Sequence, residues 1–297
     1  MPQSMKTALA YVGVLLIWGT TPLAIQWSSQ GVGFLLSVSA RMSIAAVLAV
    51  VAVLIWERKL PVSLSALGSY TAGSVGVFGA MLCVYWAAQY ISSGLVSILF
   101  GIAPVFTGVQ AYYLLGEGFG LRKALGLIVS LLGLFIVFAD SLGGGVFNAY
   151  AVVALLGSAL LFSLCSVLVK KLSVPVTPMQ QTAGTLLVSA VAYIGLCLTV
   201  QVQLPSSISW KASVSLLYLA GVCSVLGFFL YFYVLEVTSA GSVALITLIS
   251  PVIALSLGAL LNGEVFGLTL LAGAACIALG LTTYQWPSIE ALLSKRA

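Results

Sequence analysis

One arginine lies inside a long apolar stretch, where a charged side chain is energetically costly. Arg41 falls inside an apolar stretch at residues 33–56, about eight residues from its start. At 1.5 Å per residue, a helix would carry it about 12 Å from the end of that stretch. Charged side chains in apolar helices usually face an internal cavity, and a guanidinium binds carboxylates. Arg41 is therefore a candidate carboxylate ligand, unless its long side chain extends to the surface instead.

The residues that usually carry protons or bind metals are missing from the apolar stretches. The chain has no histidine, and its acidic residues lie in connecting segments or at the ends of apolar stretches: Glu57, Glu117, Asp140, Glu236, Glu264 and Glu290. The five cysteines show no CxxC spacing and are interpreted as small hydrophobic residues. We therefore expect no cofactor, no metal site, no disulfide and no proton relay.

Composition predicts that these stretches lie in a membrane. Hydrophobic residues make up 62% of the chain and charged residues 6%, whereas about 25% of a soluble domain is charged. A helix needs about 20 apolar residues to cross a bilayer. The predicted fold is an all-α integral membrane protein with ten spans, at 7–27, 33–56, 66–89, 92–114, 121–140, 148–169, 178–200, 212–235, 239–261 and 268–286.

The basic residues predict the orientation of these spans, because lysine and arginine mark the cytoplasmic side. With the N-terminus inside, nine of the eleven fall in cytoplasmic segments: Lys6, Arg58, Lys59, Arg122, Lys123, Lys170, Lys171, Lys295 and Arg296. Lys211 falls outside, and Arg41 lies within a span. Both termini are therefore predicted to be cytoplasmic. The net charge of +5 arises mainly in short loops and does not indicate nucleic-acid binding.

One stretch of the chain occurs twice. Residues 94–134 and 241–281 match without a gap at about fifteen positions. The shared positions include a proline and a Gly-Glu pair, at Pro104 and Pro251 and at Glu117 and Glu264, with an offset of 251 − 104 = 147 residues. A repeat of about half the chain means that the molecule consists of two copies of one design.

The two copies are predicted to be inverted. Each holds five spans, so the second enters the membrane in the opposite sense. The loop GEGFGLRK of the first copy carries Arg122 and Lys123, and its counterpart GEVFGLTL carries neither. The predicted units are five-span repeats at residues 1–145 and 146–297. Inverted repeats that hold a substrate near the bilayer midplane are typical of transporters.

Two five-span halves, each with a mid-span proline before a Gly-Glu loop, resemble the drug/metabolite transporter superfamily of the EamA type. The Trp18–Gly19 pair in the first span also suits that family. The resemblance covers essentially the whole chain and is greatest to the bacterial aromatic amino-acid exporter branch. It implies a non-enzymatic carrier of the bacterial inner membrane that exports amino acids, neutral and aromatic ones included, by alternating access. The missing proton relay favours facilitated over tightly proton-coupled movement.

The candidate substrate site is a cavity between the halves. Aromatic rings near mid-depth suit an apolar substrate group, and the predicted lining is Trp18, Arg41, Phe78, Phe100, Pro104, Phe162, Phe228 and Pro251. The two prolines are hinges or static kinks. The repeat-equivalent Tyr85 and Tyr233 would narrow the two mouths, or belong to the interfacial aromatic belt. Glu117 and Glu264 are expected to cap the helices that follow them, with a gate salt bridge as the alternative.

Other functions have less support in the sequence. Nucleotide-sugars need several basic groups for their diphosphate, and only Arg41 lies within a span. Cationic drugs would need a buried carboxylate, an enzyme would need a histidine or a midplane acid, and a channel is not favoured by two inverted halves. The expected partners are a small-molecule substrate and the lipid bilayer, without nucleic acid. The sequence leaves the oligomeric state open, a monomer included.

Overall fold

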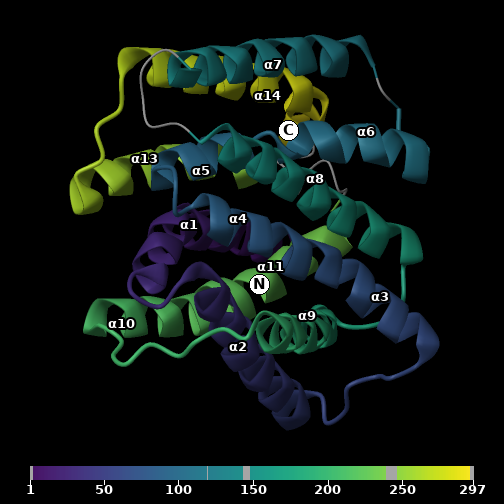
Figure 1. Ribbon diagram of the computed structural model, residues 1–297. Helices are drawn as coiled ribbons and strands as arrows, with labels where there is room; N and C mark the ends of the chain where they lie inside the picture. Colours follow the sequence, from purple (N-terminus) through teal and green to yellow (C-terminus); the bar gives the residue numbers. More distant parts are fainter. Residues whose placement is uncertain (1–2, 119, 143–147, 239–245, 295–297) are drawn as a thin grey trace.

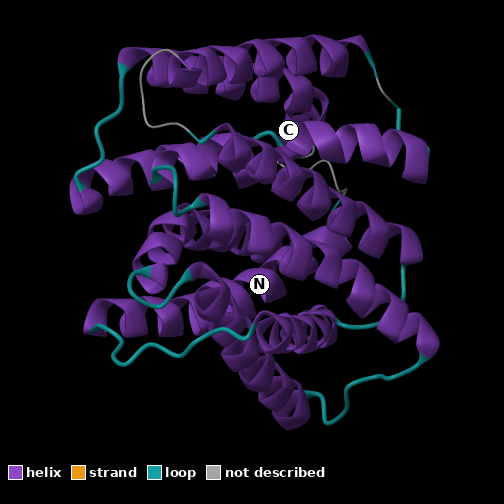
Figure 2. Ribbon diagram, in the orientation of Figure 1, coloured by secondary structure: helices purple, strands orange, loops and turns teal. Residues whose placement is uncertain are grey.

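The computed structural model describes residues 3–118, 120–142, 148–238 and 246–294, and among them every regular element is a helix (Figures 1 and 2). The first half contains α1 (Gln3–Ser29), α2 (Phe34–Trp56), α3 (Leu64–Ser74), η1 (Val75–Ala80), α4 (Met81–Ala87), α5 (Ser93–Phe100), α6 (Ala103–Leu115) and α7 (Leu121–Leu142). The second half contains α8 (Ala149–Leu172), α9 (Pro178–Val200), α10 (Trp210–Tyr218), η2 (Leu219–Leu226), α11 (Gly227–Val237), α13 (Ile246–Asn262) and α14 (Leu268–Ser294).

Among the described residues, each predicted span corresponds to one helix or to a run of consecutive helices; the first seven residues of the predicted span 239–261 lie outside the described part. The runs are α3–η1–α4, α5–α6 and α10–η2–α11. Seven of the helical segments in the described part of the chain are long and apolar enough to cross a bilayer, and the apolar parts of α13 and α14 are shorter. The chain is an all-helical, multi-pass membrane protein.

Two spans contain a π-helix where the sequence predicts uninterrupted helix. Upstream of the prolines the repeat continues at an offset of 148, which places Ala72 and Gly73 on Ala220 and Gly221. With this offset η1 corresponds to residues 223–228 and overlaps η2 at residues 223–226. A π-turn is wider than an α-turn and often marks a functional site. The hydroxyl of Tyr193 on α9 donates to the carbonyl of Phe78 at 2.8 Å, which satisfies a backbone group of η1. Both halves therefore widen the same span at nearly the same place.

The two repeat prolines lie in different local structures. Gly101 and Ile102 separate α5 from α6, and Pro104 lies in the first turn of α6. Proline is favoured there because first-turn N–H groups have no acceptor within the helix. Pro251 lies inside α13, which continues on both sides of it. The first-half span is therefore broken just before Pro104, not merely kinked at it as the sequence predicts.

The helices pack as two-fold copies of each other. Helix α1 of the first half packs on α13 of the second half. Its equivalent in the second half, α8, packs on α6 of the first half, and α6 is part of the span that is equivalent to α13. In the same way α2 packs on η2, and α9 packs on η1. A contact that is repeated when the halves are exchanged is the pattern that two-fold symmetry requires.

The last helices of the two halves, α7 and α14, lie side by side along one edge of the bundle (Figure 1). A Cβ atom added at Gly126 would lie 2.5 Å from the carbonyl oxygen of Gly280, and one at Gly133 would lie 2.7 Å from that of Gly273. These contacts are images of each other, because Gly126 is equivalent to Gly273 and Gly133 to Gly280. Small residues let helix backbones approach closely, so this joint between the halves depends on glycine.

Replacing Gly126 by leucine should therefore separate α7 from α14. The added Cβ alone would meet backbone atoms of Tyr284 and Gly280 at 2.4 and 2.5 Å, and overpacking of this kind costs about 1–3 kcal/mol. Gly157→Leu in α8 is the matched control, because nothing lies within 4 Å of an added Cβ there. Thermal unfolding in detergent should give a lower midpoint for Gly126→Leu only; equal midpoints would show that the joint does not stabilise the fold.

Candidate functional site

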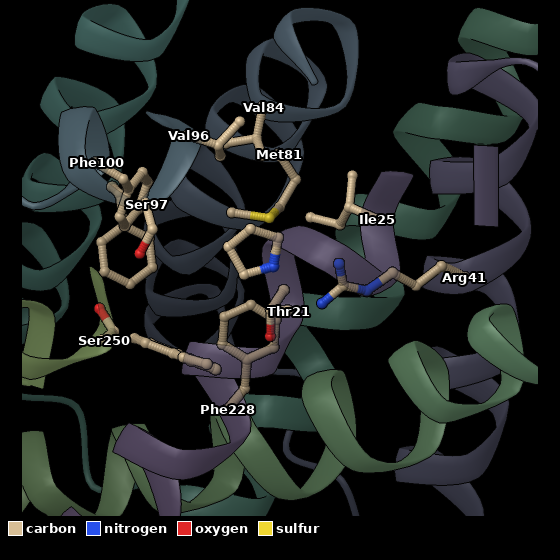
Figure 3. Close-up of a pocket in the computed structure, with 13 residues that line it drawn as sticks. Thr21, Ile25, Arg41, Met81, Val84, Val96, Ser97, Phe100, Phe228 and Ser250 are labelled. Carbon is tan, nitrogen blue, oxygen red and sulfur yellow. The ribbon is translucent and has the colours of Figure 1, made fainter. Parts of the chain in front are cut away.

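A cavity of about 70 Å³ lies between helices of the two halves (Figure 3). Its walls come from α1, α2, α4 and α5 in the first half and from α8, α11 and α13 in the second. Five of the residues predicted from the sequence line it: Trp18, Arg41, Phe100, Phe162 and Phe228. The lining is mainly apolar and includes one charged group.

The charged group is the guanidinium of Arg41, which points into the cavity (Figure 3). The side chain is only 2% exposed, so it does not extend to the surface of the bundle. Its Nε donates to the Ser224 hydroxyl at 2.9 Å, and its Nη1 to the Tyr85 hydroxyl at 3.4 Å. The guanidinium carbon also lies 5.9 Å from the centre of the Tyr85 ring, within the range of a cation–π interaction. Contacts from α4 and η2 thus hold Arg41 at the cavity wall.

No carboxylate balances this charge among the side chains that the structure describes. Both hydrogen-bond partners of Arg41 are neutral hydroxyls. Glu57, which follows α2, lies 57 − 41 = 16 residues further along, or about 24 Å at 1.5 Å per residue. A buried charge is costly unless it is paired, and the described part of the chain supplies Arg41 with hydroxyl partners only.

Aromatic rings form the wall around Trp18. Its ring centre lies 5.5 Å from that of Phe162 and 6.0 Å from that of Phe228, both in edge-on contact. Phe100 lies 5.2 Å from Phe162 and extends the cluster to α5. Ring pairs at these distances attract each other beyond simple burial. The cluster offers flat apolar surfaces from both halves to one ligand.

Tyr231 belongs to the same cluster and was not among the predicted site residues. Its ring lies 5.1 Å from Trp18 and 5.3 Å from Phe162. Its hydroxyl is hydrogen-bonded to Ser166, one turn beyond Phe162 on α8. The pair therefore joins α8 to α11 just beyond the cavity. Two features of the sequence could have indicated this pair. Ser166 follows Phe162 by four residues, about one helical turn, and Tyr231 lies close to Phe228 in the sequence.

Several predicted residues lie away from this cavity. Phe78 packs on Tyr193, with ring centres 4.7 Å apart, and is not part of the lining. Pro104 is buried in α6 and also lies outside it. Pro251 borders a separate apolar cavity of about 210 Å³ between α5, α13 and α14. Tyr233 is half-buried on α11.

The position of Tyr85 differs from the one expected for a residue that narrows a mouth of the transport pathway. Tyr85 is fully buried and accepts a hydrogen bond from Arg41, and it is not among the residues that line the cavity. Its gating role stays a prediction. The sequence also missed lining residues that have neither a charge nor an aromatic ring: Thr21, Pro22, Ile25, Met81, Val84, Val96, Ser97 and Ser250. Of these, only Pro22 had a signal, as a proline within an apolar span.

At one end of the bundle, Glu264 ties the two halves together. Its carboxylate accepts hydrogen bonds from the backbone N–H and the hydroxyl of Ser93, at 3.0 and 2.8 Å, and from the N–H of Gly94, at 3.2 Å. Glu264 therefore caps α5, where the helix dipole favours an anion. The expectation that it caps the following helix, α14, is wrong, because the acceptor lies next to a helix of the other half. The corresponding role of Glu117 stays a prediction.

Further hydrogen bonds surround Glu264. Asn262 donates to Glu264 at 3.1 Å and to Gln26 at 3.3 Å, and it accepts from the indole N–H of Trp27 at 3.1 Å. We call Gln26, Trp27, Ser93, Asn262 and Glu264 the Glu264 cluster. The cluster joins the end of α1, the start of α5 and the end of α13, and so closes this end of the bundle.

The opposite end, where α8 and α11 finish, is more open. A cavity of about 310 Å³ lies there, and its lining includes Ser69, Lys170, Ser173, Gln181 and Glu236. Lys170 donates to the carbonyls of Leu235 and Thr238, both at 2.8 Å, and so caps the end of α11. We call this the Lys170 end. The Lys170 end thus contains a polar cavity, and hydrogen bonds from Thr177 to Glu57 and from Ser69 to Gln181 also join the two halves there.

An apolar helical bundle in two like halves, with a cavity lined by both, is the architecture typical of membrane transporters. The chain belongs to the EamA-like transporter family, whose model matches residues 5–139 and again residues 149–284. The predicted EamA-type membership is confirmed. The narrower assignment to the aromatic amino-acid exporter branch stays a prediction.

Relatives of similar length are transporters by name. The uncharacterized transporter YoaV of Bacillus subtilis is 25% identical over 279 residues, which cover 93% of this chain and 96% of YoaV. An uncharacterized transporter of Archaeoglobus fulgidus is 24% identical over 286 residues, which cover 93% of this chain and 98% of that protein. A solved crystal structure with 17% sequence identity matches with a TM-score of 0.70 over 97% of this chain and 99% of that chain, so the fold is a known one.

Glu264→Gln should loosen the start of α5. Glutamine has about the size of glutamate, but an amide nitrogen replaces one of the two oxygens that accept hydrogen bonds at α5. A hydrogen bond to a charged group contributes about 1.5–3 kcal/mol. Hydrogen–deuterium exchange of a peptide covering residues 93–100 should rise more than fivefold. Glu236→Gln, an exposed carboxylate at the Lys170 end, should leave that peptide unchanged. Equal exchange in both variants would show that the cap does not stabilise α5.

Proposed function

We propose that this protein is a carrier of the bacterial inner membrane that exports amino acids, broadly and with neutral and aromatic ones included, by alternating access. The observation that carries the proposal is the buried guanidinium of Arg41, which has only neutral partners and borders a cavity with aromatic walls. A guanidinium binds a carboxylate through two parallel hydrogen bonds, and aromatic walls accept an apolar side chain. Family membership supports transport, and the amino-acid cargo and export direction rest on the resemblance described above.

The proposed architecture is ten spans in two inverted repeats, residues 1–145 and 146–297, with both termini cytoplasmic. The duplicated glycine contacts between α7 and α14 support the inversion, because they are the same contact seen from each half. The distribution of lysine and arginine supports the orientation. In this orientation the Lys170 end faces the cytoplasm and the Glu264 end faces outward.

Transport follows from the difference between these two ends. Substrate enters from the hollow Lys170 end, its carboxylate pairs with Arg41, and its side chain packs against Trp18 and the neighbouring rings. Release requires the Glu264 cluster to separate while the Lys170 end closes. We assign the accompanying bends to the break before Pro104 and to Pro251 in α13.

Energy coupling is proposed to be facilitated and not tightly linked to protons. The chain has no histidine, and no carboxylate lines the cavity among the described residues. Export of nucleotide-sugars or drugs, the alternatives within the superfamily, would respectively require more basic groups or a buried acid near the site.

Flux measurements test this function. Purified protein in liposomes would be assayed with radiolabelled phenylalanine, threonine, lysine and glutamate, with and without a pH gradient. We expect flux of phenylalanine and threonine that the gradient changes little. No flux of any of the four would refute the amino-acid assignment, and strong stimulation by the gradient would refute the facilitated mechanism.

Arg41→Ala should raise the KM for carboxylate substrates more than tenfold while the protein still inserts and folds. The reason is that removing one partner of a buried charged pair costs about 2–5 kcal/mol. Lys171→Ala removes an equal charge from an exposed position at the end of α8 and should transport normally. Arg41→Lys, which keeps the charge but not the planar fork, should fall between the two. Unchanged kinetics in Arg41→Ala would remove Arg41 from the site.

A further inference from the structure

The cavity carries one permanent charge and, among the described side chains, no opposite one. Arg41 is buried and bonded only to hydroxyls, and the other lining residues are apolar or carry a hydroxyl. The acidic residues with described side chains lie at helix ends or in connections, at Glu57, Glu117, Glu236 and Glu264. The site therefore has a net charge of +1 before any substrate binds.

We infer that the preferred substrates are organic monoanions, small acids with one carboxylate, an apolar or aromatic group and no ammonium, and that the membrane potential drives their export. The inference rests on the proposed function, since it assigns the carboxylate to the same arginine in the same cavity. It departs from that function in one respect: an acid without the ammonium should be preferred to the amino acid of the same skeleton, which remains a weaker substrate. It also names what drives export.

Charge balance selects against the ammonium group. A bound monoanion makes the loaded site neutral, whereas a zwitterionic amino acid leaves it with a net charge of +1. Unbalanced charge in apolar surroundings is disfavoured because hydration is lost. The hydroxyls of Thr21, Ser97 and Ser250 in the lining can hydrogen-bond an ammonium but cannot neutralise it. Of two substrates with the same carbon skeleton, the one without the ammonium should bind more tightly.

The charge of the substrate also identifies the energy source for export. A guanidinium stays protonated throughout the physiological pH range, so each turnover moves only the charge of the substrate. A monoanion carries one negative charge outward, and a zwitterion carries none. With the cell interior negative, a potential of 100 mV acting on one charge sustains an outward concentration ratio of about 50-fold. No proton carrier is needed, which fits a cavity without titratable acids among its described residues.

A matched pair of probes tests the inference. L-Phenyllactate differs from L-phenylalanine in a hydroxyl that replaces the ammonium, so the two share their size and aromatic ring. Liposomes with and without the purified protein would be loaded with either radiolabelled probe at pH 7.5. A potassium gradient and valinomycin would set the interior negative, positive or at zero potential, and efflux would be followed.

We expect phenyllactate to leave protein-containing liposomes at least tenfold faster than phenylalanine at zero potential. An interior-negative potential should accelerate phenyllactate efflux, an interior-positive potential should slow it, and neither should change phenylalanine efflux. Arg41→Gln should abolish phenyllactate flux, and Arg41→Lys should keep the dependence on potential at a lower rate. The comparison within the wild-type protein stands even if Arg41→Gln does not fold.

Each of the other possible outcomes would refute a different part of the inference. Phenylalanine efflux equal to or faster than phenyllactate efflux would refute the monoanion preference and leave the proposed amino-acid export standing. Phenyllactate efflux that ignores the potential would refute the energy source. Efflux of neither probe above the protein-free liposomes would refute this inference together with the proposed function.

Discussion

A backbone that crosses a bilayer must satisfy its own N–H and C=O groups, and this constraint governs the molecule. It explains why every regular element described is a helix. It also explains why the irregular places are covered by specific side chains. Tyr193 donates to a carbonyl of η1, Lys170 donates to the carbonyls at the end of α11, and Glu264 accepts the N–H groups at the start of α5. At these three places a side chain of another helix supplies the missing polar partner.

The two π-helical spans lie next to the cavity: η2 supplies Ser224, which accepts from Arg41, and α4, which follows η1, supplies Tyr85. Ser224 of η2 and Tyr85 of α4 hold the guanidinium of Arg41, while Trp18 and its neighbouring rings supply the apolar wall. Because both halves contribute to the walls, a relative movement of the halves reshapes the site. The unbalanced charge then lies at the one place where a ligand would bridge them.

The sequence was sufficient for properties that depend on depth in the membrane. Span lengths follow from bilayer thickness, and Arg41 and Trp18 were recognised because they lie far from the ends of their spans. Depth does not specify the rotation of a helix about its axis, so Phe78 was expected in the cavity although it packs on Tyr193. Partners distant in the chain were also beyond reach: the acceptor for the start of α5 comes from residue 264, 171 positions after Ser93. Local sequence patterns carry no record of that contact.

The two repeat prolines show a further consequence. Gly101 and Ile102 interrupt the helix just before Pro104, while α13 passes through Pro251 without a break. Two near-copies of one sequence thus hold two conformations at the same time, one interrupted before its proline and one continuous through it. Exchanging the two conformations between the halves would yield the opposite state from the same parts. In the alternating-access cycle proposed above, the break would pass from one half to the other, and the same repeated stretch of sequence would serve both end states.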